Sequence, residues 1–265
     1  MYVNKIQFAG DYVLVSNHTH RVFGAPHHKR GQKQRITPKA MAEYNKKMRT
    51  EKLQLLMLLN FDKGYHLTLD YPKDKRPGTY EEAEKNLKKL LYATSRKMRK
   101  IKPFKYIAIT ERGKKRAALH HHVVIEGDPL LLQTITDIWG RHIKISQMYE
   151  EGAYKDLAEY LTKIETKEEQ TKGKSKYHRS RNLKKPTEKS RIVMGAIPEE
   201  PLIPKGFDII QGSVISGYNE YVGIYFQKYL LRRKPQKTKH EPKSEQKGRM
   251  AHKIWNRIKN IFRRS

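Results

Sequence analysis

The chain has 265 residues, of which 37% are apolar and 32% are charged, so a packed core must be confined to part of it. The absence of cysteine excludes disulfides and thiolate metal sites. No stretch approaches the roughly 18 consecutive apolar residues of a membrane span, and the N-terminal residues lack a signal-peptide core, so we expect a soluble, cytoplasmic protein.

The formal net charge is +30, from 57 Lys and Arg against 27 Asp and Glu. A compact protein with this charge repels itself unless a polyanion neutralises it, which indicates nucleic acid as the partner. Charge alone does not separate an enzyme from a basic protein that only coats nucleic acid.

In chain order, residues 2–15 alternate between apolar and polar side chains and predict one or two strands. A basic loop follows over residues 20–35. Thr37 and Pro38 are typical of an N-cap and first-turn proline, and they predict a helix to about Leu59. Its basic residues favour a nucleic-acid contact over a core element, with a solvated helix as the alternative; they are Arg35, Lys39, Lys46, Lys47 and Arg49.

The central segment predicts a regular alternation of strands and helices. Apolar residues recur at helical spacing over residues 79–101, and Thr79 with Glu82 forms a capping-box pattern. The remaining predicted elements are strands over 65–71, 104–110, 119–125 and 142–145, and helices over 129–139 and 152–165. The second and third strands are expected to pair as a hairpin. This order predicts an α+β fold with helices against an antiparallel sheet.

The expected organisation has four parts. Residues 1–60 hold an N-terminal strand and basic helix packed on a domain of residues 61–190. Residues 191–230 form a small C-terminal extension. Residues 231–265 form a basic tail with thirteen Lys and Arg against two Glu, disordered up to about Met250 and then able to form a basic amphipathic helix.

Three consecutive histidines carry the first chemical signal, in the run LHHHVVI over residues 119–125. On a strand, alternate side chains share a face, so His120 and His122 project together and His121 points away. Two imidazoles and a carboxylate can hold one divalent ion, and Glu111 is placed for this across the predicted hairpin. A surface histidine cluster is the competing interpretation, and the apolar residues that follow argue against it.

Tyr160 and Lys163 carry the second signal, in the run YLTK within the last predicted helix. Positions three apart lie on one helical face, so the phenol and the ammonium can meet. A free tyrosine has a pKa near 10, and a cation about 4 Å away interacts with a phenolate by roughly 4 kcal/mol at an effective dielectric near 20. This is too little for phosphodiester cleavage alone, and a metal at the scissile phosphate would supply the rest. Taken alone, Tyr160 is as well explained as a core aromatic.

These motifs, in this order, resemble the HUH endonuclease superfamily. The further runs TLDYP, ITERGKKRAALHHHVVIEG, IWG, LAEYLTK and SRNLKKP resemble bacterial rolling-circle replication-associated proteins over about residues 65–186. The resemblance implies a five-stranded antiparallel sheet with helices, similar to an RNA-recognition or ferredoxin-like fold. It also implies Mn²⁺ or Mg²⁺ at Glu111, His120 and His122, with Tyr160 as the nucleophile and Lys163 as its accompanying lysine.

The implied activity is rolling-circle initiation: nicking and joining of one DNA strand through a 5′-phosphotyrosine, with a free 3′-hydroxyl left as primer. The implied partners are single-stranded or melted origin DNA and a host helicase and polymerase, because no G-x-x-x-x-G-K-[ST] helicase motif occurs. We expect DNA contacts from the basic turn and from the run near residue 182, that is from Arg112, Lys114, Lys115, Arg116, Arg179, Arg181, Asn182, Lys184 and Lys185.

Two departures from the family pattern bear on the site. His121 stands where an aliphatic residue is usual, and no second tyrosine lies four residues from Tyr160. Tyr154 is six residues away, and we interpret it as a packing residue. Two alternatives stay open: a single-tyrosine transposase of the same superfamily, and a non-catalytic nucleic-acid-binding protein.

Overall fold

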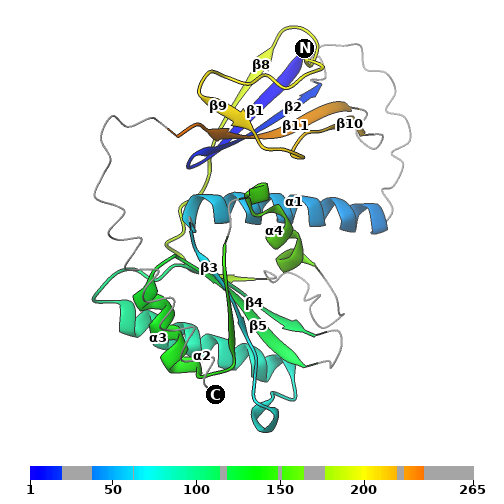
Figure 1. Cartoon of the computed structure of the whole chain (residues 1–265). Helices are drawn as coiled ribbons and strands as arrows, with labels where there is room; N and C mark the ends of the chain where they lie inside the picture. Colours follow the sequence, from blue (N-terminus) through cyan, green and yellow to red (C-terminus); the bar gives the residue numbers. More distant parts are fainter. Residues whose placement is uncertain are drawn as a thin grey trace, which may run out of the picture. The chain divides into compact units, whose positions relative to one another are not determined.

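The computed structural model describes residues 1–19, 38–61, 63–113, 118–148, 151–163, 177–219 and 224–235, apart from the side chains at 38, 40, 151 and 152. The described residues form two compact units (Figure 1). The first unit takes its residues from within 1–63, 148–163 and 181–234, and the second from within 64–147 and 177–180. Each unit is built around its own antiparallel sheet.

The second unit contains a five-stranded sheet with the order β6-β3-β5-β4-β7. Its strands are β3 (Tyr65–Leu69), β4 (Tyr106–Arg112), β5 (Leu119–Ile125), β6 (Ile143–Gln147) and the short β7 (His178–Arg179). All neighbours are antiparallel, and β4 and β5 form the expected hairpin. The predicted α+β class and five-stranded antiparallel sheet are confirmed.

One face of this sheet is covered by α2 (Tyr80–Met98) and α3 (Pro129–Trp139). Alternation along β5 places Val123 and Ile125 on this helix face, where they join a core with Leu87 and Leu91 of α2 and with leucines of α3. The apolar residues predicted from helical spacing are therefore the buried side of α2. A short 3₁₀ helix, η1 (Lys73–Lys75), precedes α2.

The N-terminus of α2 is capped as the sequence predicts. The Thr79 hydroxyl accepts a hydrogen bond from the Glu82 backbone N–H over 3.2 Å. The Glu82 carboxylate reaches back to the N–H of Gly78 at 3.0 Å, one residue before the usual partner in a capping box.

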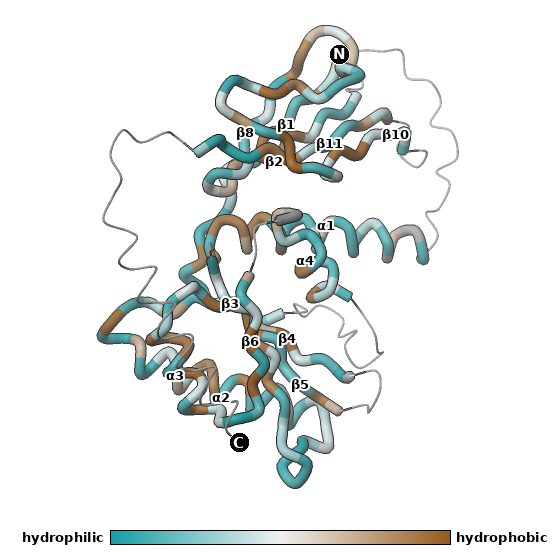
Figure 2. Tube along the Cα trace, in the orientation of Figure 1, coloured by the Kyte–Doolittle hydropathy of each residue, from teal (hydrophilic) through white to brown (hydrophobic). Residues whose placement is uncertain are grey.

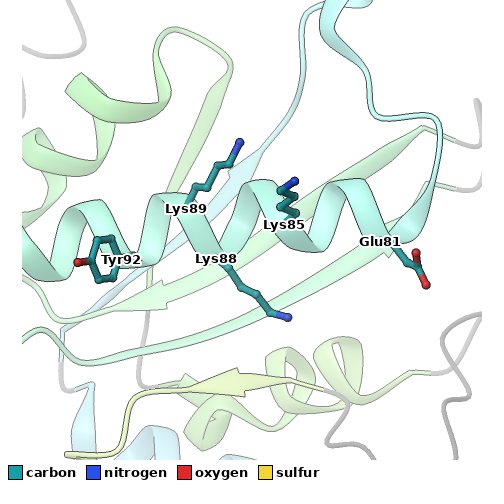
Figure 3. Close-up of a pocket in the computed structure, with 5 residues that line it drawn as sticks. All are labelled: Glu81, Lys85, Lys88, Lys89 and Tyr92. Carbon is teal, nitrogen blue, oxygen red and sulfur yellow. The ribbon is translucent and has the colours of Figure 1, made fainter.

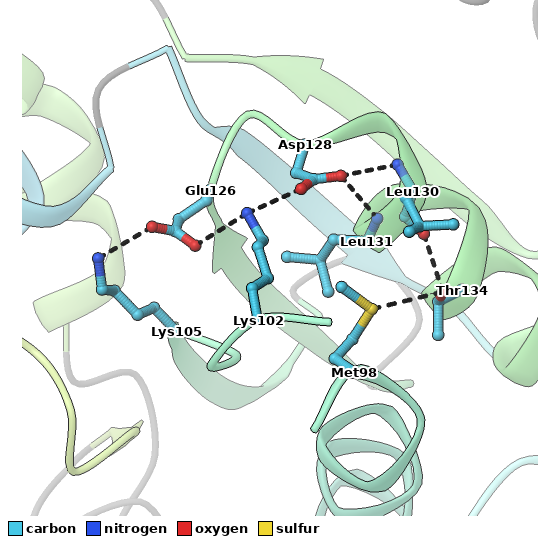
Figure 4. Close-up of polar contacts among 8 residues, drawn as sticks. All are labelled: Met98, Lys102, Lys105, Glu126, Asp128, Leu130, Leu131 and Thr134. Atoms are coloured by element: carbon cyan, nitrogen blue, oxygen red, sulfur yellow. Dashed lines mark hydrogen bonds and ion pairs between the residues drawn. The ribbon is translucent and has the colours of Figure 1, made fainter. Parts of the chain in front are cut away.

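Asp128 fixes the start of α3 (Figure 4). Its Oδ1 accepts the backbone N–H groups of Leu130 and Leu131 at 2.8 and 3.1 Å, and its Oδ2 pairs with Lys102 Nζ at 2.8 Å. Burial raises the pKa of Asp128, but the hydrogen bonds from Lys102 and from the two backbone groups outweigh it, and the net pKa lies below its usual value. Lys102 also bonds Glu126, which pairs with Lys105 at 2.9 Å.

The first unit contains a six-stranded sheet that the sequence analysis does not foresee. Its order is β10-β11-β2-β1-β8, and β9 pairs with β11 off this path. The strands are β1 (Tyr2–Ala9), β2 (Tyr12–Thr19), β8 (Thr187–Val193), β9 (Phe207–Ile209), β10 (Ile215–Asn219) and β11 (Ile224–Arg233). Gly10 has a φ of +67° in the tight β1–β2 turn, a conformation that favours glycine.

The helix α1 (Pro38–Asn60) divides into two halves. In the N-terminal half, Lys39, Lys46 and Lys47 are exposed, in agreement with a solvated or nucleic-acid-binding arm. The C-terminal half is a core element, with Leu53 and Met57 fully buried, so the expectation of a purely peripheral arm is wrong there. Figure 2 shows the same division as a change from teal to brown along α1.

The last predicted helix, over residues 152–165, is shorter and broken. It consists of the 3₁₀ helix η2 (Glu151–Tyr154) and of α4 (Lys155–Thr162). Tyr154 has a φ of +58° at the junction, its ring is 5% exposed, and its hydroxyl donates to the carbonyl of Phe61 over 3.4 Å. The left-handed residue turns Tyr154 into the core beside α1, which supports its interpretation as a packing residue.

The unit boundaries differ from the expected divisions at residues 60, 190 and 230. Residues 1–60 do not pack as an appendage, because β1 and β2 pair with β8 and β11 in the same sheet. The segment expected as a C-terminal extension thus supplies most of a sheet. The expected tail lies outside the described residues from 236 onward. In the part of the chain that the structure describes, every helix is too short or too polar to cross a bilayer.

Candidate metal site and tyrosine helix

Three side chains converge on one face of the five-stranded sheet: Glu111, His120 and His122. Glu111 is paired in register with His120 across the β4–β5 hairpin, and His122 follows two residues along β5. One ligand atom from each of the three lies within 4.8 Å of the others. We call this side the histidine face; it is opposite the helix face that carries Val123 and Ile125.

The cluster is half enclosed. The Nε2 atom of His122 lies 3.1 Å from Glu111 Oε2, and that of His120 lies 4.0 Å from the same oxygen. The side chain of His122 is 3% exposed, whereas those of Glu111 and His120 are 16% and 15% exposed. Solvent therefore reaches the cluster from the side of Glu111 and His120.

Backbone and side-chain acceptors orient both imidazoles. His120 Nδ1 lies 3.3 Å from the carbonyl of Ala118, and this bond leaves Nε2 as the unprotonated nitrogen. His122 Nδ1 lies 3.1 Å from His66 Nε2 and 3.3 Å from Thr68 Oγ1, both on β3. With the proton of His122 on Nδ1, its Nε2 presents a lone pair toward Glu111, as metal ligation requires.

The donor set fits a divalent cation. Two imidazole nitrogens and one carboxylate oxygen suit Mn²⁺ or Mg²⁺ less exclusively than an all-oxygen set, and they leave coordination positions for water or phosphate. The bonds from Ala118, Thr68 and His66 are the outer-sphere contacts that usually accompany such ligands.

Sequence reasoning misses His66. It lies on the histidine face of β3 in register with Val124, and its ring stacks on His122 with centroids 5.1 Å apart. Burial, and to a lesser degree the neighbouring His122, lower the pKa of His66 to about 4, so the ring is neutral at physiological pH. Alternation in residues 65–69 indicates which face His66 takes, but only the β3–β5 register reveals its partner.

His121 lies on the helix face, as alternation predicts, and it is fully buried. The Tyr71 hydroxyl lies 2.6 Å from its Nε2, and Thr110 Oγ1 lies 2.9 Å from its Nδ1. Thr110 donates to Glu84 over 2.5 Å, and Glu84 also bonds His178 of β7. His121 Nδ1–H therefore donates to Thr110, and Nε2 accepts from Tyr71. Burial lowers the pKa of His121 to about 3, which keeps this ring neutral.

Tyr160 lies near the end of α4 with 41% of its surface exposed. The opposite side of α4 is anchored on α1: Leu161 is buried, and the hydroxyls of Thr162 and Thr50 lie 2.7 Å apart. The alternative that Tyr160 is a core aromatic is wrong. Its ring is exposed because Ala158, Leu161 and Thr162 take the buried side.

Lys163 differs from its expected position. The helix ends at Thr162, and Lys163 has extended backbone with a φ of −66° and a ψ of 131°. Its N–H donates to the carbonyl of Tyr160 over 3.2 Å, which closes the last turn. The expectation that Lys163 shares a helical face with Tyr160 is therefore wrong, because Lys163 follows the last helical residue.

The expected DNA contacts are spread over both units. Arg112 ends β4, and Arg179 lies exposed in β7. Arg181, Asn182, Lys184 and Lys185 are exposed in the first unit, where Asn60 holds the backbone of Lys184 through bonds of 2.8 and 2.9 Å. Lys114, Lys115 and Arg116 lie outside the described residues.

Fold and site together define an α+β protein with a His–His–Glu cluster on a five-stranded antiparallel sheet. A model of the replication-associated protein family of the ORF2 type matches residues 64–232, which is more than half of the chain. The chain belongs to this family of replication-associated proteins. No curated protein and no solved structure matches it.

Proposed function

We propose that the chain is a rolling-circle replication initiator that nicks one strand of origin DNA and stays attached to the cut end. The observation that carries the proposal is the cluster of Glu111, His120 and His122, found in a chain of the replication-associated family. A basic protein that only coats nucleic acid has no need for two imidazoles oriented by Ala118, Thr68 and His66.

In this proposal, Tyr160 is the nucleophile. Its phenol oxygen attacks the scissile phosphorus, and the bond from phosphorus to the 3′ oxygen breaks. The 3′ oxygen leaves as a hydroxyl after it takes up a proton, and the 5′ phosphate remains esterified to the tyrosine. The exposure of Tyr160 on a helix anchored from behind gives single-stranded DNA access to the phenol.

The remaining residues prepare the phosphate and the phenol. Glu111, His120 and His122 would hold a Mn²⁺ or Mg²⁺ ion, which supplies charge neutralisation at the phosphate when bound. Lys163 would favour the phenolate of Tyr160 and the developing negative charge. Arg112, Arg179, Arg181, Lys184 and Lys185 would contact the DNA backbone, as would Asn182 and the basic turn residues Lys114, Lys115 and Arg116.

Several finer features follow from the same proposal. The 3′-hydroxyl that is released would prime synthesis, and a host helicase and polymerase would separate and copy the strands. The joining step is the reverse reaction, in which a 3′-hydroxyl attacks the phosphotyrosine. A single-tyrosine transposase would share this chemistry and differ in the DNA ends that it joins.

End-labelled oligonucleotides test the proposal. A single-stranded oligonucleotide with an origin sequence is incubated with the full chain and Mn²⁺, and the products are denatured. A 3′ label should move with the protein and a 5′ label should be released as a shorter fragment, because the 5′ phosphate is the end that becomes attached. Tyr160→Phe should yield neither product while DNA affinity stays within about twofold, since the change keeps charge and ring shape. Cleavage by this variant, or by the wild type in excess chelator, would contradict the proposal.

A further inference from the structure

The outward side of α2 carries a continuous basic surface. Positions 85, 88, 89, 92, 96 and 99 fall within about 120° of one another around a helix with 3.6 residues per turn. We call these residues the α2 stripe: Lys85, Lys88, Lys89, Tyr92, Arg96 and Arg99. All six are exposed, and Tyr92 is 72% exposed.

The stripe forms an open hollow rather than a closed cavity. Glu81, Lys85, Lys88, Lys89 and Tyr92 line it. Figure 3 shows Lys85 and Lys89 leaving the helix on one side and Lys88 on the other, with Tyr92 one turn further along.

Positive charge along this surface is not offset locally. Residues 85–100 contain seven Lys and Arg and no Asp or Glu, and the acidic residues of α2 lie in its first turns at Glu81, Glu82 and Glu84. Among the described residues, none of the stripe cations forms an ion pair, whereas Glu84 is bound to His178 and Thr110. The stripe therefore has a net field for an anionic partner.

The stripe faces away from the metal cluster within the second unit. The inner side of α2 packs through Leu87, Leu90 and Leu91 on the helix face of the sheet. Glu111, His120 and His122 lie on the opposite face. A DNA strand at the cluster therefore does not occupy the stripe, and the stripe needs another partner or another part of the same DNA.

The length of the stripe selects a polymer over a small anion. From Lys85 to Arg99 the helix rises by about 21 Å, at 1.5 Å per residue. Over that length duplex DNA carries about twelve phosphate charges, at one per 1.7 Å of axis. A single phosphate would need convergent donors, and these side chains diverge along an axis. Tyr92 adds a hydroxyl of the kind that contacts DNA phosphates.

We propose that the α2 stripe binds the sugar–phosphate backbone of duplex DNA and holds the double-stranded part of the origin beside the nicked strand. The identification of the polyanion as DNA rests on the proposed function. The stripe itself contributes affinity and orientation without reading sequence, because its cations are positioned for backbone phosphates and no element of it enters a groove.

Neutralising the stripe tests this proposal in the full chain. The variant Lys85→Gln/Lys88→Gln/Lys89→Gln keeps good helix formers and removes three charges. The matched control, Lys73→Gln/Lys75→Gln/Arg76→Gln, removes three exposed charges from η1 and the residue after it. Anisotropy of a labelled duplex, measured at several salt concentrations, gives the affinity and its salt dependence for each protein.

The stripe variant should bind duplex more weakly, and its log–log salt slope should be shallower by about two to three, at about 0.9 for each phosphate that is no longer neutralised. The control should change the slope by less than one. Cleavage of a short single-stranded oligonucleotide should be unchanged in both, so a failure of the nicking proposal is recognised separately.

Two results would overturn the assignment. Equal losses in the stripe variant and the control would mean that only total charge matters. An unchanged slope in the stripe variant would exclude duplex DNA, and a loss of binding to polyglutamate or to anionic vesicles under the same conditions would assign the surface to an acidic protein or a lipid instead.

Discussion

The two units differ in how far apart in the sequence their functional contacts lie. In the second unit, Glu111 and His120 are nine residues apart and meet across one hairpin. In the first unit, β1 pairs with β8 and β2 pairs with β11, so residues such as Asn17 and Gln227 meet across 210 positions. Local patterns therefore identify the metal cluster, whereas the unit that carries Tyr160 requires long-range strand pairing that no short pattern encodes.

The comparison extends to the proposed chemistry. The ligand cluster belongs to the second unit and Tyr160 to the first. Variants in the cluster should change metal binding, and variants in the first unit should change cleavage without changing metal binding. Each prediction below uses this separation or tests the local contacts on which it depends.

The largest effect is expected for the ligands. His122→Ala or His120→Ala should lower Mn²⁺ affinity by more than the roughly 10–100-fold that outer-sphere partners cost, and should remove cleavage. Isothermal titration with Mn²⁺ measures the affinity directly, and circular dichroism confirms that the fold is kept. Unchanged Mn²⁺ affinity in both variants would place the metal elsewhere.

His66 should have the next largest effect. His66→Phe keeps a ring stacked on His122 but removes the acceptor for its Nδ1 proton. Mn²⁺ affinity should fall by about 10–100-fold with little loss of stability. His66→Asn, which retains a side-chain acceptor, should restore part of the affinity. Equal affinities in the wild type and in His66→Phe would reduce His66 to a packing residue.

His121 should affect folding rather than metal binding. His121→Ala leaves the Tyr71 hydroxyl and Thr110 without a partner on the helix face and opens a cavity, at a cost of about 2–4 kcal/mol in the free energy of unfolding. Urea denaturation measures the loss, and titration of the folded variant should give nearly wild-type Mn²⁺ affinity. A loss of affinity as large as in His122→Ala would show that the face assignment is wrong.

Acid should destabilise the second unit through the same histidine. The folded-state pKa of His121 is lowered to about 3 from an unfolded value of 6.5, so the unfolded chain binds more protons between these pH values. Its contribution to stability is fully present above pH 6.5 and falls with decreasing pH, by up to about 1.4 kcal/mol per unit. Denaturation at pH 7 and pH 5 should show this slope, and His121→Asn should make it shallower.

Asp128 should give the smallest effect. Asp128→Ala removes the cap of α3 and should lower the free energy of unfolding by about 1 kcal/mol at pH 7. Because the folded-state pKa of Asp128 is lowered, this contribution is present above its unfolded pKa and is lost as the pH falls through the folded value. The difference between variant and wild type should therefore narrow in acid; a constant difference would mean that the carboxylate charge does not contribute.

The sequence predicted the second unit well because its information is local. Alternation separated His121 from His120 and His122, helical spacing gave the buried side of α2, and Thr79 with Glu82 marked its start. The partners of those residues on other elements, His66 and Thr68 for His122 and Tyr71 for His121, depend on the β3–β5 register and on tertiary packing.

The first unit was predicted poorly for the corresponding reason. The alternation in residues 2–15 indicated strands but not their partners, which follow residue 186. The end of α4 before Lys163 was missed because the residues up to Thr162 have an uninterrupted helical pattern, and only the described backbone shows where the helix stops.

Peptide mapping of the covalent adduct tests most directly whether the two units form one active site. Wild-type protein is incubated with Mn²⁺ and a single-stranded origin oligonucleotide, digested, and analysed by mass spectrometry. The account predicts a nucleotide-modified peptide that contains Tyr160 in the wild type and in His121→Asn, and no modified peptide in His122→Ala. Modification of Tyr154 or of another residue in its place, or an adduct in His122→Ala equal to that of the wild type, would contradict it.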